Sequence, residues 1–234
     1  MILYVNGDSH TAGAEAVNPH AFAEDDPALF YLGRAPHPEN LAVSWGKLLS
    51  LTLKAAFRCD AESASSNSRI IRTTREWLAG AGQDFADQLV IIQWSTWERE
   101  EWLYEGQYYL VGASGIDNVH VGLHEKYKNY IASVDWLEKT QQAHNEIWHF
   151  HQELKEQNIQ HIFFNGNNDF SKITNQKDWG KNYIGPYNPD QTYDATIRSK
   201  GIDTVMPGSW HFGQDGHSAF HRFILNYIIK HKFV

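Results

Sequence analysis

The alternation of apolar and polar positions along the chain predicts strands and helices in turn. The clearest strand is Gln88–Trp94, a nearly continuous apolar run that is typical of a parallel strand covered on both faces. Shorter runs predict strands at residues 1–6, 55–59, 161–165 and 203–205. Helical spacing of apolar residues predicts four helices. The first covers residues 40–53 and is capped by Asn40, and the second runs from the Ser/Asn cluster near residue 65 to Gly80 and Gly82. The other two cover residues 124–157, with one break, and residues 215–231.

The segments between these elements predict long loops. Residues 14–39 are rich in proline and mixed in polarity, residues 95–120 are aromatic and irregular, and residues 166–203 are mostly loop. Strands that alternate with helices in this way imply an α/β sandwich around a parallel sheet of about five strands. We expect one domain over residues 1–234.

Small polar residues follow the predicted strands, and this pattern indicates where a site would lie. In parallel α/β sheets, ligands bind beyond the carboxyl ends of the strands. Residues of this kind follow each strand in turn: Ser9, Ser65-Ser66-Asn67, Ser95, Asn167-Asn168, and Asp215 with His217. That edge of the sheet is the candidate site.

Composition narrows the function classes. The 234 residues are 42% hydrophobic and carry a net charge of −8, which argues against nucleic acid as the main partner because phosphate contacts need clustered cations. No apolar run reaches the length of a membrane span, and the N-terminus lacks the pattern of a secretory signal, so we expect a cytoplasmic protein. Cys59 is the only cysteine, which excludes disulfides within one chain and cysteine-based zinc sites.

Two histidine pairs invite a metal interpretation. His217/His221 and His120/His124 are each four residues apart, the spacing that places two ligands on one helical face. Neither pair encloses the glutamate of a zinc protease, and no third ligand is evident. We therefore expect neither a metal nor another cofactor.

The residues at the predicted sheet edge suit acyl transfer. A serine hydroxyl becomes a nucleophile when a histidine, oriented by a carboxylate, takes its proton. Ser9 is the candidate nucleophile, His217 the candidate base and Asp215 its orienting acid, with His211 as a competing base. A turn or cap residue is the plain alternative for Ser9, and a helix N-cap for Asp215.

An oxyanion needs hydrogen-bond donors. The candidates are the backbone N–H of Ser9, an N–H from the Ala64–Ser65 turn, and the side chain of Asn67 or Ser95. For Asn67 a helix cap is an equal alternative.

Three blocks of the sequence resemble the SGNH (GDSL-type) hydrolases. Gly-Asp-Ser-His-Thr at 7–11 is similar to the family's first block, and the segment at 64–74 resembles the second as it occurs in phage and bacterial relatives. Asp-Gly-His at 215–217 resembles the last block, which carries the catalytic Asp and His. The resemblance implies a flavodoxin-like three-layer fold, ester hydrolysis through an acyl-enzyme, and no metal.

The sequence departs from the family's pattern at three places. The third block, Gly-x-Asn-Asp after the central strand, is replaced by Gln93-Trp94-Ser95-Thr96, which removes the oxyanion asparagine unless Ser95 or Asn67 takes its place. The glycine of the second block is Ala64. One residue rather than two separates Asp215 from His217.

These observations predict a serine esterase that acts on a small acyl ester, for instance an acetyl group on a saccharide. Trp94 and Trp97, beyond the central strand, are candidates for a substrate-binding wall, with core packing as the alternative. The competing hypothesis is a binding or structural protein, a virion or cell-surface component that kept the fold and lost turnover. Release with a phage particle is the alternative to a cytoplasmic location.

Overall fold

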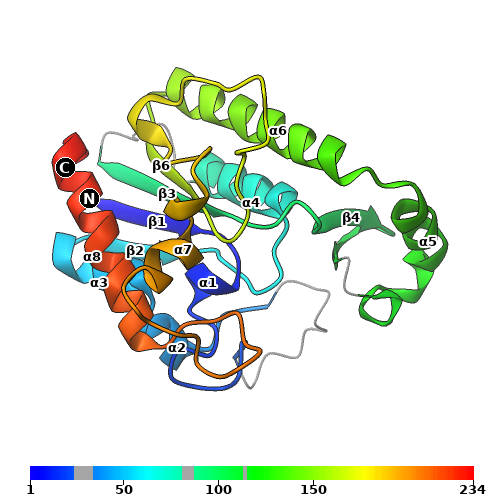
Figure 1. The fold of residues 1–234 in the computed structure, drawn as a ribbon, viewed down its shortest axis with the longest axis horizontal. Coiled ribbons are helices and arrows are strands. Elements are labelled where there is room, and N and C mark those ends of the chain that lie inside the picture. Colours follow the sequence, from blue (N-terminus) through cyan, green and yellow to red (C-terminus); the bar gives the residue numbers. More distant parts are fainter. Residues whose placement is uncertain (24–33, 81–86, 113–114) are drawn as a thin grey trace.

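Four parallel strands form the central sheet (Figure 1). The computed structural model describes residues 1–23, 34–80, 87–112 and 115–234. The strands are β1 (Ile2–Asn6), β2 (Ala56–Cys59), β3 (Gln88–Trp94) and β6 (Gln160–Asn165), in the order β2-β1-β3-β6. The predicted α/β class and parallel sheet are confirmed, and β3 is buried at every position.

The order of the strands reverses direction at β1. From β1 the chain passes to β2 on one side and then to β3 on the other, with Val5 paired to Cys59 and to Ile91. Such a reversal of direction leaves a ligand site outside the carboxyl ends of the strands. The sheet has four strands rather than about five, because the predicted strand at 203–205 makes only an isolated antiparallel bridge from Thr204 to Phe212.

Helices cover both faces of the sheet, which gives three layers. One core is formed with α4 (Asn67–Gly80) and α6 (Trp136–Glu156), and the other with α3 (Trp45–Leu53), α7 (Tyr193–Arg198) and α8 (Gln214–His231). Side chains alternate along a strand, so Tyr4 of β1 enters the first core while Leu3 and Val5 enter the second. Both cores position the strand ends rigidly.

Two helix boundaries depend on capping side chains. The helix predicted at 40–53 is two helices, α2 (Pro38–Val43) and α3, because Ser44 adopts an extended conformation and its Oγ accepts the Lys47 N–H at 3.3 Å. Asn40 is not the cap that the pattern indicated; it is buried within α2. The predicted break at 124–157 is confirmed, with α5 (His124–Ser133) before α6 and Asp135 capping α6. Gly80 ends α4, and Gly82 lies outside the described residues.

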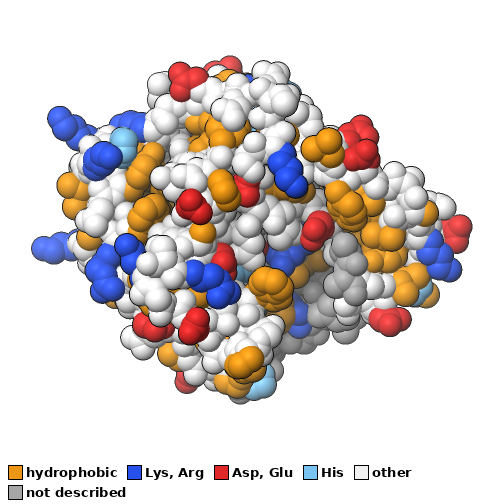
Figure 2. All heavy atoms as spheres, in the orientation of Figure 1, with side chains coloured by type: hydrophobic (Ala, Val, Ile, Leu, Met, Phe, Trp, Pro, Cys, Tyr) orange, Lys and Arg blue, Asp and Glu red, His pale blue; other side chains and the backbone are white. Residues whose placement is uncertain are grey.

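The segment after β3 forms a projection rather than an irregular loop. It contains a hairpin of β4 (Glu100–Tyr104) and β5 (Gln107–Val111), two 3₁₀ turns (Ile116–Asn118 and Val121–Leu123) and α5, around a third apolar cluster. Arg72 of α4 holds the hairpin by a two-fold hydrogen bond to Glu101, at 2.6 and 2.8 Å. Hydrophobic side chains gather on this projection, at the right of Figure 2.

The segment at 166–203 is less irregular than the sequence indicated. It contains the 3₁₀ turns Gly180–Asn182 and Pro189–Gln191 and the helix α7. Thr192 caps α7 by accepting the Ala195 N–H. Among the described residues, no helix is long and apolar enough to cross a membrane.

Candidate active site

Ser9 lies immediately beyond the carboxyl end of β1. It is the first residue of α1 (Ser9–Ala12), a single turn capped by Asp8, and it is 5% exposed. Gly13 ends the turn with φ of 76°, a left-handed conformation that glycine adopts without strain. The turn therefore holds Ser9 in a buried position at the end of β1 and fixes its backbone.

The carboxylate of Asp8 is the centre of a buried hydrogen-bond network. Its Oδ1 accepts the His10 backbone N–H and the Gln93 side-chain N–H at 3.1 and 2.7 Å, and lies 3.1 Å from His10 Nδ1. Its Oδ2 accepts from Ser95 Oγ at 3.0 Å and from Arg99 Nη1 at 2.9 Å. Burial acts to raise the pKa of Asp8, but His10 and Arg99 outweigh it and hold the pKa well below its usual range. These donors thus fix the ionised side chain of Asp8, the residue that precedes Ser9.

Gly7 is required by the close approach of this network. A Cβ there would lie 2.6 Å from Thr11 Oγ1 and 3.0 Å from Gln93 Cβ. Thr11 Oγ1 donates a hydrogen bond to Gln93 Oε1 at 2.7 Å, which orients the amide of Gln93 so that its N–H points to Asp8. The glycine of Gly-Asp-Ser is therefore a packing requirement of the loop before Ser9.

The predicted oxyanion residues meet at the same edge of the sheet. Asn67 clamps the loop after β3: its Oδ1 accepts the Ser95 N–H at 2.8 Å, and its Nδ2 donates to the Ser95 carbonyl at 3.2 Å. The Ser65 N–H is engaged in a turn with the Glu62 carbonyl. Ala64 has φ of 68°, which places a non-glycine residue in the left-handed region where the family's glycine would stand.

His217 and Asp215 do not lie as the sequence suggested. His217 is 1% exposed, and its Nδ1 accepts the Trp45 backbone N–H at 3.3 Å. A ring whose Nδ1 accepts carries its proton on Nε2 when neutral, so Nε2 has no lone pair for a serine proton. Burial, with His10 and His211 nearby, lowers the pKa of His217 to about 3. Asp215 is exposed, and its Oδ1 accepts the N–H of Gly216 rather than orienting His217.

His211 is the histidine with the surroundings of a base. Its Nδ1 lies 3.0 Å from Glu15 Oε2, and its ring lies 5.6 Å from that of His10, the residue after Ser9. His10 Nε2 also lies 3.1 Å from the Trp210 carbonyl, so the segment before α8 packs against α1. Burial and His10 lower the pKa of His211, against a smaller opposing effect of Glu15, and a neutral ring at pH 7 can accept a proton.

Trp94 and Trp97 belong to the core and do not form a substrate-binding wall. Trp94 is 1% exposed and packs edge-on against Phe150 and Phe163. Trp97 is buried and stacks on Phe170 with ring centroids 4.5 Å apart. β3 ends under α6, so both indoles point into the apolar layer. The packing alternative was the correct one for both.

Three residues of the site were not predicted from the sequence. Glu15 contacts His211 and Arg99 contacts Asp8, and in each pair the two residues are distant in the chain. Gln93 stood in the altered third block and signalled a departure from the family, but not its bond to Asp8. An arginine four residues after Ser95 was the one available hint, because the hydrogen bond from Arg99 Nη1 to Ser95 Oγ closes that loop.

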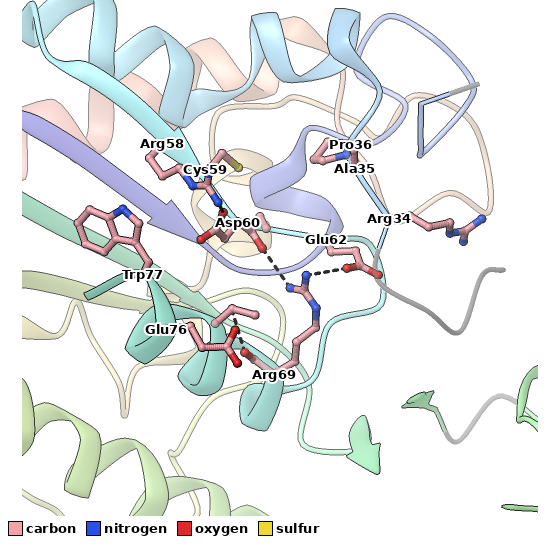
Figure 3. Close-up of a pocket in the computed structure, with 12 residues that line it drawn as sticks. Arg34, Ala35, Pro36, Arg58, Cys59, Asp60, Glu62, Arg69, Glu76 and Trp77 are labelled. Atoms are coloured by element: carbon pink, nitrogen blue, oxygen red, sulfur yellow. Dashed lines mark hydrogen bonds and ion pairs between the residues drawn. The ribbon is translucent and has the colours of Figure 1, made fainter. Parts of the chain in front are cut away.

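A cavity opens beside this edge, between the end of β2 and α4 (Figure 3). Its volume is about 570 Å³, and Arg58, Asp60, Glu62, Arg69 and Trp77 are among its lining residues. Figure 3 shows Arg69 reaching toward Glu62 and the Asp60 carbonyl, with Nη2 2.6 Å from Glu62 Oε2. Burial raises the pKa of Glu62 to about 7, although Arg69 opposes the shift. The Glu62 N–H donates to the Gly7 carbonyl, so the cavity adjoins the loop that precedes Ser9.

The histidine pairs make other contacts. His221 Nε2 lies 3.0 Å from Thr52 Oγ1, and His124 Nε2 lies 2.9 Å from the Val119 carbonyl. Within residues 1–23, 34–80, 87–112 and 115–234, no three side chains of His, Cys, Asp or Glu are grouped so as to hold a metal ion.

Comparison with known proteins gives one family match. Residues 22–168 match the profile described as "Family of unknown function (DUF6071)". A search of curated proteins gives no match.

Several solved structures are similar to the whole chain. A member of the lipolytic protein G-D-S-L family from Veillonella parvula is 11% identical, with 97% of each chain covered and a TM-score of 0.48. The acetyl xylan esterase Est2A from Butyrivibrio proteoclasticus is 13% identical at a TM-score of 0.48; 97% of this chain is covered, and it spans 63% of that chain. Axe2, an acetylxylan esterase from Geobacillus stearothermophilus, is 12% identical over 97% of this chain and 93% of that one, at a TM-score of 0.41.

Proposed function

This chain belongs to the family of unknown function DUF6071, and we propose that it is a serine hydrolase that cleaves a carboxylic ester through an acyl-enzyme. One observation carries the proposal. Ser9, in the buried turn after β1, is followed by His10, whose ring packs on His211, a histidine with a lowered pKa and a carboxylate at its Nδ1. A serine, a neutral histidine and a carboxylate linked by these contacts are the components of an acyl-transfer site.

In this proposal Ser9 Oγ attacks the ester carbonyl, and His211 Nε2 takes the hydroxyl proton. His211 replaces His217 in this role, because the Nδ1 of His217 accepts from Trp45 while that of His211 faces a carboxylate. The Oγ–acyl bond forms as the ester C–O bond breaks, and His211 returns the proton to the leaving alcohol. A water molecule, deprotonated by the same histidine, then releases the acid and regenerates Ser9.

The oxyanion would be stabilised by N–H groups at the sheet edge. The proposed donors are the backbone N–H of Ser9, that of Ala64, and the second amide hydrogen of Asn67, since its first is bonded to the Ser95 carbonyl. Ser95 Oγ donates to Asp8, so Ser95 would contribute by holding Asp8 and not by direct contact. Fixed donors of this kind are each worth about 2.7–4 kcal/mol of transition-state stabilisation.

The proposed substrate class is a small acyl ester of a polar alcohol, such as an acetylated saccharide. The cavity beside Gly7 would accommodate the alcohol. Its guanidinium and carboxyl groups suit hydroxyl groups as hydrogen-bond partners, and Trp77 supplies an apolar side. Trp77 stacks on Tyr4 at 4.1 Å, so it is already held in place.

Turnover of a short ester panel tests the proposal. Wild-type protein is expected to hydrolyse p-nitrophenyl acetate and acetylated xylose, and to lose at least about 10³-fold in kcat/KM in Ser9→Ala. Equal rates in the variant, with its fold intact by circular dichroism, would contradict the proposal. A folded protein with no turnover would favour the alternative function, a binding protein on a hydrolase scaffold, which the loss of the third-block asparagine also favours.

A further inference from the structure

The geometry points to Glu15 as the carboxylate that orients His211, in the place that the sequence analysis gave to Asp215. The inference rests on the proposed function and assigns one of its positioning residues. Glu15 lies six residues after the proposed nucleophile, whereas His211 lies close to the other end of the chain. The histidine and its orienting carboxylate, which both lie near the C-terminus in the last block of the SGNH pattern, would here come from opposite ends of the chain.

Three contacts hold Glu15 to His211. Glu15 Oε2 lies 3.0 Å from His211 Nδ1 and accepts a hydrogen bond from Ser209 Oγ at 2.8 Å. The same Ser209 Oγ accepts the backbone N–H of His211 at 3.0 Å. Ser209 therefore fixes both the carboxylate and the backbone that carries the imidazole. The side chains of His211 and Glu15 are 21% and 29% exposed, so water reaches the pair only in part.

The backbone of Glu15 provides a second observation. Its φ is 63°, in the left-handed region that costs a non-glycine residue about 1–2 kcal/mol. The residues on either side, Ala14 and Ala16, are buried, and the Ala16 N–H donates to the Gly13 carbonyl, so a turn after α1 carries the Glu15 side chain that contacts His211. Glycine would relieve the strain but would remove the carboxylate. Strain that persists at a crevice is a common mark of a functional residue.

The contact between Glu15 and His211 determines which ring nitrogen of the neutral histidine carries the proton. A carboxylate is an acceptor only, so the Nδ1 that faces it carries hydrogen and Nε2 keeps its lone pair. The close contact with His211 and the hydrogen bond from Ser209 keep the pKa of Glu15 below its usual value despite partial burial, so the group is ionised at pH 7. As His211 takes the proton of Ser9, the imidazolium formed is paired with an anion that is already in place.

Asp215 lacks all three contacts. It is exposed at the start of α8, and its Oδ1 is bonded to the adjacent Gly216 N–H. The spacing of Asp215 and His217 in the sequence therefore describes the first turn of a helix and not a catalytic pair. The carboxylate in contact with His211 comes from the segment that follows α1.

Replacement of Glu15 by Gln tests the inference. Ser209 Oγ and His211 Nδ1 both contact the same oxygen, Glu15 Oε2, so the amide oxygen of the glutamine would keep both contacts and the substitution would remove the negative charge alone. Glu15→Gln is expected to lower kcat about 10²-fold with little change in KM, because the imidazolium formed in the transition state loses the anion that stabilises it. Glu15→Asp is expected to recover part of the rate, because it keeps the charge.

A pH profile separates an orienting role from a structural one. Glu15 raises the pKa of His211, so in Glu15→Gln the residual activity should rise with pH at a lower midpoint than in the wild type. Glu105→Gln is the matched control: Glu105 is also a glutamate at positive φ, 48°, but it is exposed at the β4–β5 turn. Glu105→Gln should leave rate and midpoint unchanged.

The rate of fluorophosphonate labelling at Ser9 distinguishes the two proposals. Labelled wild-type protein with slow labelling in folded Glu15→Gln supports the role of Glu15. Equal labelling rates, or equal midpoints, in the two proteins would overturn it and leave the serine hydrolase standing. A wild-type protein that does not label at Ser9 would overturn both.

Discussion

Arg99 Nη1 lies 2.9 Å from Asp8 Oδ2, which ties the loop after the central strand to the residue that precedes Ser9. Asp8 is 3% exposed and ionised, so the burial of its negative charge depends on hydrogen-bond donors such as Arg99. The loop that carries Ser9 is thus held from the segment after β3 as well as from β1.

Arg99→Ala is expected to destabilise the protein by about 1.5–3 kcal/mol, the usual effect of losing a hydrogen bond to a charged group. Asp8 would keep His10, Gln93 and Ser95 as partners, which limits the loss. Urea denaturation measures the change, and labelling of Ser9 should slow by about 10- to 100-fold as its loop loosens. Arg198→Ala is the matched control, since Arg198 also pairs with an aspartate at 2.8 Å but is 44% exposed and should matter little. Equal destabilisation by both variants would contradict the role of Arg99.

Gly7→Ala is expected to cost about 1–3 kcal/mol of stability, because the new Cβ would meet Thr11 and the Gln93 side chain at 2.6 and 3.0 Å. The displaced Gln93 would also lose its bond to Asp8. Gly80→Ala, at the end of α4 with nothing within 4 Å of the new Cβ, should be neutral or slightly stabilising. Thermal unfolding of the two variants gives the comparison; a Gly7→Ala melting temperature equal to that of the wild type would remove the packing argument.

Buried histidines predict a loss of stability in mild acid. His151 Nδ1 lies 2.7 Å from His161 Nε2, and burial lowers their pKa values to about 4 and about 3. The unfolded chain binds these protons near pH 6.5, so it holds more protons than the folded chain between about pH 3 and 6.5. The free energy of unfolding should therefore be highest above pH 6.5 and should decrease as the pH falls from about 6.5 to about 3.

The comparison of His161→Gln with wild type tests this source of acid sensitivity. The variant removes one imidazole, so its loss of stability between pH 7 and 4.5 should be smaller by on the order of 1–2 kcal/mol. Urea denaturation at the two pH values measures both slopes. Identical slopes would show that other groups cause the acid response.

His217 and Asp215 should respond to mutation as structural and surface residues. His217→Asn keeps an acceptor near Nδ1 for the Trp45 N–H and is expected to lower stability by about 1–3 kcal/mol while Ser9 still labels. Asp215→Asn should change the labelling rate less than about twofold, since it contacts neither histidine. Loss of labelling in folded Asp215→Asn would restore the pairing that the sequence suggested.

The strands that are buried on both faces were predicted from the sequence, because a short continuous apolar run such as Leu89–Ile92 is typical of a parallel strand covered by helices on both sides. The sequence also placed Ser9 at the end of β1, where motif and strand are adjacent in the chain. The hairpin of β4 and β5 was missed, although Glu105-Gly106 between two aromatic strands carried a turn signal. A strand was predicted at 203–205, but within the described residues this segment makes only an isolated bridge, from Thr204 to Phe212.

The site was predictable only where its residues are neighbours in sequence. Asp215 and His217 were chosen by their spacing, but the capping of α8 and the Trp45 N–H decide what they do. The contact between Glu15 and His211 joins residues at opposite ends of the chain, and no local periodicity reports it. Trp94 and Trp97 are a further example. The sequence around an aromatic residue at the end of a strand does not distinguish a side chain that faces a ligand from one that packs in the core, as these two do.

The most direct test of the proposed hydrolase is the mass of the protein after incubation with a fluorophosphonate. One adduct is expected, mapped by peptide sequencing to Ser9, absent from Ser9→Ala and strongly reduced in His211→Asn, while His217→Asn still reacts. An unmodified wild-type protein, or an adduct that persists in His211→Asn and is lost in folded His217→Asn, would contradict the assignment of the nucleophile or of its base.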